Sequence, residues 1–372
     1  MRNNIDEVIA KVSAKLRRTV PEEAKNHNVP YASRDGKWME SPWNLGNSWW
    51  TAGFWPGMMW LMNALTPDVV YHDEAVRTTE LMTEEFRVYR HLNHDVGFMY
   101  LLSCGAKHKI DGDEQSKWDT LHAASLLMGR FNPTTTPRGG YIKAWDGKDF
   151  AIVDCMMNLP LLYRATRESG DPRFAAVARI HADKAAEHFV RADGSCRHIV
   201  EFDPVTGDFV REHGGQGYCE GSSWSRGQAW ALYGFTLLAM NTGEAKDLAV
   251  AEKIAAYFAA NIREDGLTDC DFRQPKDVYR LDNIAGACAA CGFLELARLT
   301  GKDEYRQAGE KLLDGLIDHC CDFGDQYCGL LTHCTAAYHD DNVGTHTNIT
   351  YGDYFFVEAL CKVKGVDPML WK

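Results

Sequence analysis

Helical periodicity runs through almost the whole of this chain and limits the folds open to it. Between residues 171 and 190, for example, apolar residues recur at three- to five-residue steps with charged residues between them, as on the buried face of a helix. The same pattern predicts helices over 4–18, 50–65, 72–91, 95–106, 113–131, 153–169, 171–190, 222–242, 245–263, 282–300, 302–320 and 349–364. The chain is therefore expected to be all-α.

The predicted helices come in pairs that recur about every 40–50 residues, as in helical repeat proteins. Short turns join several of them, such as Ser169-Gly170-Asp171-Pro172 and Thr300-Gly301-Lys302-Asp303, in which glycine ends one helix and Asp or Pro begins the next. No Ser/Gly-rich linker divides the chain, so we expect one domain over residues 1–372. Such pairs form either an open solenoid or a closed six-hairpin toroid, and periodicity leaves both open.

The longer connections recur between the helical hairpins, and in a closed ring they would gather at one rim and build a cleft. They cover residues 19–49, 132–150, 191–221, 264–281 and 322–348. One of them carries a β-hairpin signal, with strands at 197–202 and 208–212 around a Pro- and Gly-containing turn.

Composition excludes several classes of partner. The chain has 40 basic and 52 acidic residues, a formal charge of −12, and no basic stripe of the kind that binds nucleic acid or anionic membranes. No apolar run reaches the roughly 18–20 residues that span a bilayer, and the charged, amphipathic N-terminus differs from a secretory signal. The 12 cysteines lack zinc-ligand spacing, and Cys288 and Cys291 read as a small-residue helix face. We expect a reduced, cytoplasmic protein without a metal.

Two carboxylates are candidates for chemistry. Asp95 opens a predicted helix in His94-Asp95-Val96-Gly97-Phe98, where it is either functional or a plain helix N-cap. Asp154 begins the apolar run Asp154-Cys155-Met156-Met157-Asn158. Burial there disfavours the anion and suits a proton donor, whereas the helix N-terminus favours the anion; the sequence leaves the balance open.

The stretch from 216 to 230, QGYCEGSSWSRGQAW, combines an amide, a guanidinium and two indoles at the start of a predicted helix. Indole faces stack on sugar rings, and a guanidinium fork grips a carboxylate, so the stretch suggests a pocket for an acidic sugar. The alternative is a buried helix start with Trp as filler. Tryptophans also cluster at 43–60. GxSxG, HExxH, GxGxxG and P-loop motifs are absent, and two carboxylates beside an aromatic platform favour attack on a glycosidic linkage.

These motifs resemble the unsaturated glucuronyl hydrolases of glycoside hydrolase family 88. The matching strings begin at Trp50 (WTAGFWPG), His94 (HDVGF), Asp154 (DCMMN), Gln216 (QGY), Trp224 (WSRGQAWALYG) and Gly352 (GDYFF), in family order and over nearly the whole chain. The resemblance implies an (α/α)6 barrel, the closed toroid.

The resemblance also implies a reaction and a set of residues. The family hydrates the C4=C5 double bond of a non-reducing-end unsaturated uronate, and the product then releases the neighbouring sugar. Asp154 matches the general acid/base and Asp95 the second carboxylate. The pocket residues implied are Trp50, His94, Trp145, His198, Gln216, Arg226 and Trp230, with Arg226 orienting the uronate carboxylate and Trp50 and Trp230 stacking on the sugar. No cofactor is implied, the partner is an unsaturated uronyl oligosaccharide, and the protein is expected to be a monomer or homodimer.

Departures from the family pattern concern the pocket rim and leave the leaving sugar open. They include His213-Gly214-Gly215 before the Gln-Gly-Tyr string, and residues 268–274. His346-Thr347-Asn348 is either part of the leaving-sugar site or an ordinary loop. Rival interpretations are an unsaturated rhamnogalacturonyl hydrolase acting on pectin fragments, a sugar 2-epimerase and a non-catalytic helical-repeat binding protein.

Overall fold

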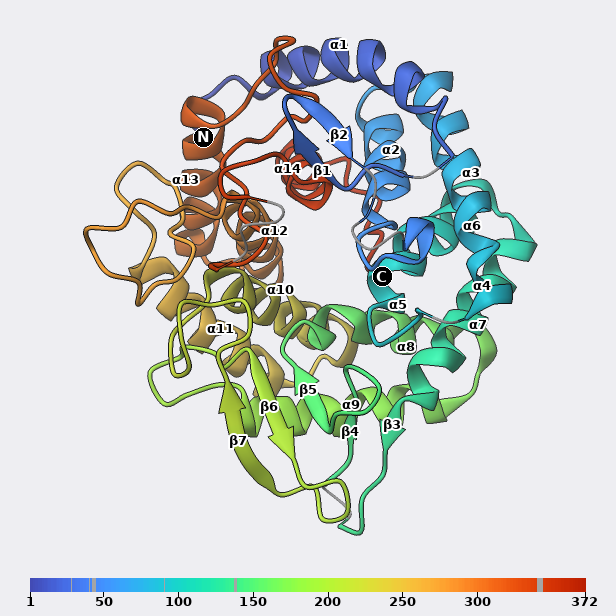
Figure 1. Ribbon diagram of the computed structural model, residues 1–372, viewed down its shortest axis with the longest axis vertical. Helices are drawn as coiled ribbons and strands as arrows, with labels where there is room; N and C mark the ends of the chain where they lie inside the picture. Colours follow the sequence, from blue (N-terminus) through green and yellow to red (C-terminus); the bar gives the residue numbers. More distant parts are fainter. Residues whose placement is uncertain (28, 40, 42–44, 90, 137–138, 340–343) are drawn as a thin grey trace.

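The chain folds into a closed ring of helices, seen in a computed structural model that describes residues 1–27, 29–39, 41, 45–89, 91–136, 139–339 and 344–372. An inner ring and an outer ring alternate along the chain (Figure 1). The inner helices are α2 (Phe54–Leu65), α5 (Val96–Tyr100) continuing through the π-helical turn η3 (Leu101–Gly105) into α6 (Ala106–Asp111), α8 (Cys155–Ser169), α10 (Ser225–Thr242), α12 (Asn283–Thr300) and α14 (Thr350–Lys364). The outer helices are α1 (Ile5–Glu23), α3 (Val69–Thr83), α7 (Glu114–Gly129), α9 (Pro172–His188), α11 (Ala245–Ala260) and α13 (Asp303–His319).

Contact between the last and first inner helices closes the ring. Each inner helix packs on the next, from α2 through η3, α5, α8, α10 and α12 to α14, and α14 packs back on α2. An open solenoid has no such closing contact, so the (α/α)6 barrel is confirmed. Inner helices are buried all round, as in α14 from Thr350 to Cys361, whereas the outer α13 exposes one face.

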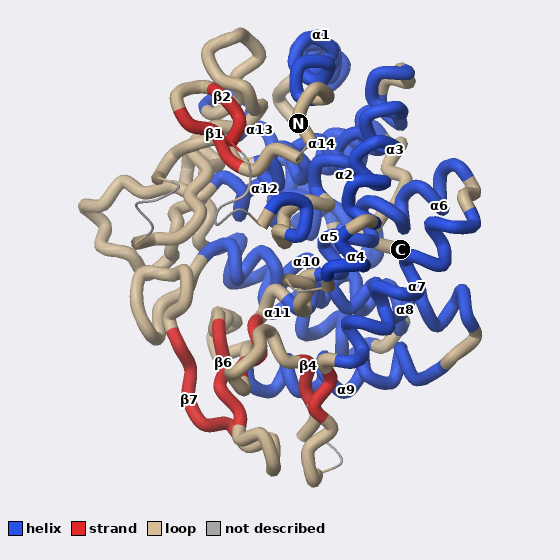
Figure 2. Tube along the Cα trace, turned by 45° about the vertical axis from the view of Figure 1, so that its right-hand side comes forward, coloured by secondary structure: helices blue, strands red, loops and turns tan. Residues whose placement is uncertain are grey.

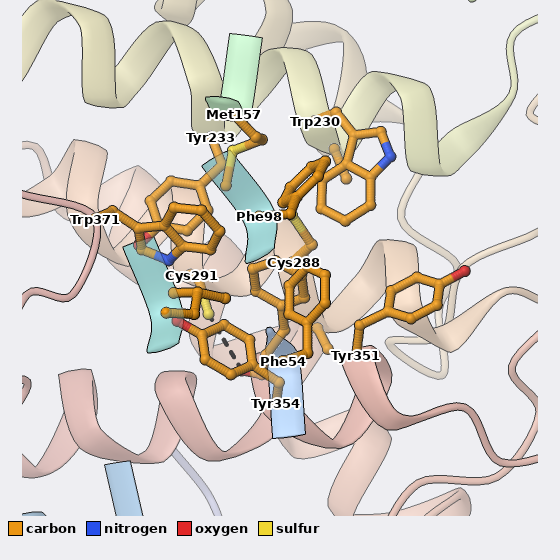
Figure 3. Close-up of a cluster of buried hydrophobic side chains, with 14 of the residues drawn as sticks. Phe54, Phe98, Met157, Trp230, Tyr233, Cys288, Cys291, Tyr351, Tyr354 and Trp371 are labelled. Atoms are coloured by element: carbon orange, nitrogen blue, oxygen red, sulfur yellow. Dashed lines mark hydrogen bonds between the residues drawn. The ribbon is translucent and has the colours of Figure 1, made fainter. Parts of the chain in front are cut away.

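Aromatic side chains from the inner helices fill the centre of the ring (Figure 3). Phe98 of α5 lies with its ring centroid 5.1 Å from that of Trp230 on α10. The C-terminal Trp371 stacks on Phe355 of α14 at 6.2 Å and donates a hydrogen bond to Glu358. Cys288 lies in the same cluster, and all 12 cysteines, each within the described residues, are free thiols.

The turn signals read from the sequence correspond to real helix ends. Gly170 closes α8 with φ 76°, and the Asp171 side chain accepts a hydrogen bond from the Arg173 N–H at 2.9 Å to begin α9. Predicted helix boundaries shift by several residues in places. The predicted helix 72–91 ends as α3 and the short α4 (Glu85–Val88), because Tyr89 is in the left-handed region with φ 57°.

The long connections carry the strands. β6 (Ile199–Phe202) and β7 (Phe209–His213) form the predicted hairpin, and β5 (Phe150–Ile152) joins it in the order β5-β6-β7. Sequence analysis missed two further hairpins, β1 (Ala32–Arg34) with β2 (Lys37–Met39) and β3 (Phe131–Asn132) with β4 (Tyr141–Ile142), because such short strands show no alternation. Trp43, the first residue of the tryptophan cluster noted at 43–60, lies outside the described part of the chain.

Alternation of outer and inner helices places the long connections at one end of the barrel. Every connection from an outer to an inner helix is long, and every return is a short turn, as between α8 and α9. Because successive helices run antiparallel, loops of one kind share one end; Figure 2 shows strands and loops gathered on one side. Among the described helices, none is both long and apolar enough to cross a bilayer.

Candidate active site

Asp95 and Asp154 begin two inner helices at the loop-bearing end of the barrel. Asp95 is the residue before α5 and Asp154 the residue before α8, yet neither side chain accepts a capping hydrogen bond from its helix. Both residues are 7% exposed. The plain N-cap interpretation therefore does not account for either carboxylate.

The two carboxylates interact electrostatically. Burial raises the pKa of the Asp95 carboxyl well above its ordinary range, and the nearby negative charge of Asp154 raises it further. The positive charge of Arg130 and the Asn158 amide act in the opposite direction. Asp95 and Asp154 are thus near enough for their charges to interact.

His198 faces Asp154 with a defined tautomer. It immediately precedes β6, and its carbonyl accepts from the Val153 N–H at 3.0 Å, which holds it beside Asp154. Nδ1 accepts a hydrogen bond from the Gln216 N–H at 3.1 Å, so in the neutral ring the proton is on Nε2. Nε2 lies 3.5 Å from Oδ2 of Asp154.

Gly215 permits this arrangement of His198. Its φ is +58°, and a Cβ built on it would lie 2.1 Å from Nδ1 of His198. The departure from the family pattern noted at 213–215 therefore has a structural consequence, because any side chain at position 215 would collide with the imidazole.

His94 is a buried, neutral imidazole beside Asp95. It has no exposed surface, and burial lowers its pKa to about 3. Nε2 lies 3.4 Å from Oδ2 of Asp95, without hydrogen-bond alignment. Trp145, on the loop between β4 and β5, meets the imidazole edge to face with ring centroids 6.3 Å apart.

Arg226 and Gln216 bind the same loop from two sides. Nη1 of Arg226 lies 2.6 Å from Oδ2 of Asp282 and donates to the Thr335 carbonyl at 2.7 Å. Nη2 donates to the Ala336 carbonyl, which also accepts from Nε2 of Gln216 at 2.7 Å. The terminal nitrogens of Arg226 are thus held by protein acceptors, and its predicted contact with a uronate stays a prediction.

The two predicted stacking tryptophans differ in exposure. Trp50 is partly buried and packs against Tyr351 and Phe98 at centroid distances of 5.0 and 5.6 Å. Trp230 has no exposed surface; Phe98 packs against its ring (Figure 3), as does Phe355 at a centroid distance of 5.5 Å. Its predicted stacking on a sugar is untested.

Several buried polar atoms at this end of the barrel lack hydrogen-bond partners among the described residues. They are both ring nitrogens of His94, Oδ2 of Asp154, Nε2 of His198, Nε of Arg226 and the indole N–H groups of Trp224 and Trp230. Buried polar atoms are nearly always paired with protein, water or a ligand, so these atoms are available to water or to a bound molecule. In the described part of the chain, no three His, Cys, Asp or Glu side chains are arranged to hold a metal ion.

Sequence analysis missed residues that support the site. Asp282 neutralises Arg226, and Oδ1 of Asn158 accepts a hydrogen bond from the Phe98 N–H shortly after Asp95. Asn158 lay inside a string that had been noted, so it had a signal. Trp224, one of the two indoles expected in the pocket, lies with its ring centroid 4.3 Å from that of His198. Arg130, which acts on Asp95, stands in no distinctive motif.

Comparison with known proteins settles the family. The sequence profile of Glycosyl Hydrolase Family 88 matches residues 15–264. This chain belongs to that family. It is similar to the unsaturated glucuronyl hydrolase of Bacillus sp. (strain GL1), with 36% identity over 334 residues that cover 86% of this chain and 87% of the relative.

Two further similarities extend the family assignment. The unsaturated chondroitin disaccharide hydrolase of Streptococcus pneumoniae (strain ATCC BAA-255 / R6) is 31% identical over 334 residues, which cover 86% of this chain and 82% of that relative. The crystal structure of the Bacillus sp. GL1 enzyme, described as responsible for the degradation of glycosaminoglycan, matches with a TM-score of 0.89 and 32% identity. That match covers 97% of this chain and 98% of the other. As a family 88 member, this protein is a glycoside hydrolase.

Proposed function

We propose that this protein is an unsaturated glucuronyl hydrolase that hydrates the C4=C5 double bond of the terminal unsaturated uronate in glycosaminoglycan-type oligosaccharides. The observation that carries the proposal is the buried Oδ2 of Asp154, which lacks a hydrogen-bond partner among the described residues and lies beside His198 and Asp95. Support for the substrate class comes from the relatives, which are named for unsaturated glucuronyl and chondroitin disaccharide substrates.

Asp154 acts as both acid and base in the proposed reaction. The Asp154 carboxyl gives its proton to C4, and the π electrons of the double bond form the new C4–H bond. Positive charge develops at C5 and is shared by the ring oxygen. Water then attacks C5 while the Asp154 carboxylate takes a proton from it, which restores the acid. The resulting hemiketal opens and releases the neighbouring sugar, so one water is consumed per turnover.

His198 and His94 set the polarity around the carboxylates. Nε2 of His198 lies 3.5 Å from Oδ2 of Asp154, and its N–H is near enough to stabilise the carboxylate after the proton has left. His94 is neutral at physiological pH, so it offers one donor and one acceptor to sugar hydroxyls beside Asp95. We assign Asp95 to bind ring hydroxyls and, in its ionised form, to stabilise the positive charge of the transition state. Because its pKa is raised, the ionised form becomes more populated as pH rises.

The remaining predicted residues either offer surface to the proposed site or support it from the interior of the barrel. Trp50 and Trp145 retain exposed surface and offer aromatic contact to the sugar. Arg226, whose charge is paired with that of Asp282, acts on the site by holding the loop at 335–336 together with Gln216. Trp230 packs against Phe98, and its indole N–H has no hydrogen-bond partner among the described residues.

Domain organisation follows from the continuity of the core. We infer that residues 1–372 form one catalytic domain, since the buried side chains of all inner helices belong to one continuous core. Function without a cofactor, a cytoplasmic location and a monomeric or homodimeric state stay predictions from sequence.

The test is a substrate panel with wild type and Asp154→Asn. Unsaturated chondroitin, hyaluronan and rhamnogalacturonan disaccharides are assayed by loss of the ultraviolet absorbance of the conjugated double bond. We expect wild type to consume the two glycosaminoglycan substrates and Asp154→Asn to fold normally but lose nearly all turnover. In heavy water, deuterium should appear at C4 of the product. Full activity of Asp154→Asn, or no deuterium at C4, would refute the assignment.

A further inference from the structure

Asn158 is a buried polar side chain in an otherwise apolar stretch of α8. It lies one turn after Asp154 in α8, is fully buried, and stands between the buried apolar residues Met157 and Leu159. Asparagine is a weak helix former, and a buried amide is costly unless its hydrogen bonds are made. Its partners therefore explain why it is there.

The Asn158 amide bridges the two helices that carry the carboxylates. Its Oδ1 accepts a hydrogen bond from the Phe98 N–H, in the first turn of α5, at 2.7 Å. Since only the oxygen can face that donor, Nδ2 points the other way, where it donates to the Asp154 carbonyl at 3.3 Å. The same amide donates toward the Asp95 carboxyl and favours its ionised form.

Gly97 shows how tightly the two helices meet at this point. A Cβ on Gly97 would lie 2.5 Å from Oδ1 and 2.6 Å from Cα of Asn158. The start of α5 therefore rests directly on the backbone of α8, and any side chain at position 97 would push the helices apart. Gly97 and the Asn158 amide together fix the position of the start of α5 relative to α8.

We propose that Asn158 is a positioning residue that sets the separation and orientation of the Asp95 and Asp154 carboxyl groups for the reaction. This inference rests on the proposed function. Asn158 itself need not touch the substrate, because its hydrogen bonds run to the backbone of both helix starts. Misplacing a catalytic group by about 1 Å costs about 10²-fold in rate, so loss of this bridge should be visible in turnover.

Asn158→Asp separates the two halves of the bridge. The variant has nearly the same shape and keeps an acceptor for the Phe98 N–H, but an oxygen replaces the donor that faces Asp154 and Asp95. We expect kcat to fall about 10²-fold while KM changes by less than about threefold. The added carboxyl raises the pKa of Asp95 further, so the acid limb of the kcat profile should move to higher pH. Asn158→Ala, which removes both halves, should lose at least as much turnover.

Asn241→Ala is the matched control. Asn241 also accepts one hydrogen bond across helices, from Nη1 of Arg167 at 2.7 Å, and donates to a carbonyl of its own helix, that of Leu237, at 2.8 Å. It stands at the end of α10 away from the long loops, so we expect lower stability with unchanged kcat and pH profile.

The outcomes distinguish the two proposals. If Asp95→Asn and Asp154→Asn abolish turnover while Asn158→Asp behaves like the control, with unchanged kcat and pH profile, the positioning role is refuted and the proposed function stands. If Asp154→Asn keeps full turnover, the proposed function fails and this inference fails with it. A large loss of kcat in Asn158→Asp, with a melting temperature like that of the control variant, supports the bridge.

Discussion

The buried ion pair between Arg226 and Asp282 offers a sharp test of how the site is supported. Both side chains are fully buried, and Nη1 lies 2.6 Å from Oδ2. Asp282 also caps α12, since its Oδ1 accepts from the Ile284 N–H at 3.2 Å. Asp282→Asn removes the charge and keeps the shape, and its amide oxygen keeps the cap on the Ile284 N–H. Its NH2 then faces Nη1 of Arg226, so the ion pair and its hydrogen bond are lost together while the cap is retained.

The stability that Asp282→Asn should lose follows from the burial of the ion pair. Two unit charges about 4 Å apart attract by about 4 kcal/mol at an effective dielectric constant of about 20, and breaking a buried pair typically costs about 3–5 kcal/mol. The Arg226 guanidinium stays charged because it cannot be deprotonated in a protein. We therefore expect Asp282→Asn to lower the free energy of unfolding in urea by about 3–5 kcal/mol. Asp282→Ala should lose about 1 kcal/mol more, because the cap is lost as well.

Removing Arg226 instead of Asp282 should make the loss of stability depend on pH. Burial already raises the pKa of Asp282, and the charge of Arg226 lowers it. In Arg226→Met the pKa of Asp282 rises further, so Asp282 takes up a proton on folding. A raised folded-state pKa gives stability that is present at low pH and lost as pH rises through that pKa. The deficit of Arg226→Met relative to wild type should shrink as pH falls. If Asp282→Asn lowers the free energy of unfolding by less than about 1 kcal/mol, the Arg226–Asp282 pair behaves like an exposed ion pair, and the predicted effect of its burial is refuted.

Two further predictions concern a glycine and a buried acid. Gly215→Ala places a methyl group 2.1 Å from the present position of Nδ1 of His198, so we expect kcat to fall by at least about tenfold. Gly301→Ala is the control, because Gly301 has a similar positive φ but open space around it. That variant should lose about 1–2 kcal/mol of stability and keep its activity. Equal kcat in the two variants would contradict this role of Gly215. Burial raises the pKa of Asp353 to about 7. As pH rises from about 4 to about 7, titration of Asp353 should therefore lower the free energy of unfolding by up to about 1.4 kcal/mol per pH unit. Asp353→Asn should flatten that slope in urea unfolding measured across the range, and an unchanged slope would show that Asp353 does not titrate there.

The helices and their ends could be predicted because their causes are local. A glycine that ends a helix and an aspartate that caps the next act within a few residues, as Gly170 and Asp171 do. The hairpin of β6 and β7 was predicted for the same reason. The two- and three-residue strands of the other hairpins were missed, since their pairing depends on the loops around them.

The candidate site was predicted in part. Asp154 drew notice because a carboxylate in an apolar run is unusual, and the structure places it with Asp95 and His198 at one end of the barrel. The surroundings of Arg226 were not foreseen. Its acceptor at Thr335 is 109 residues away in the chain, and nothing near either residue indicates the contact.

Local sequence, acting through spacing and capping over three or four residues, was enough to determine that this chain alternates helices with long and short connections and to mark its unusual carboxylates. Closure of the ring decided the rest. Only packing of α14 against α2 and of α5 against α8 brings distant loop residues to one end and buries Arg226 beside Asp282. Those contacts depend on the relative position of whole helices, which the side chains of all of them determine together.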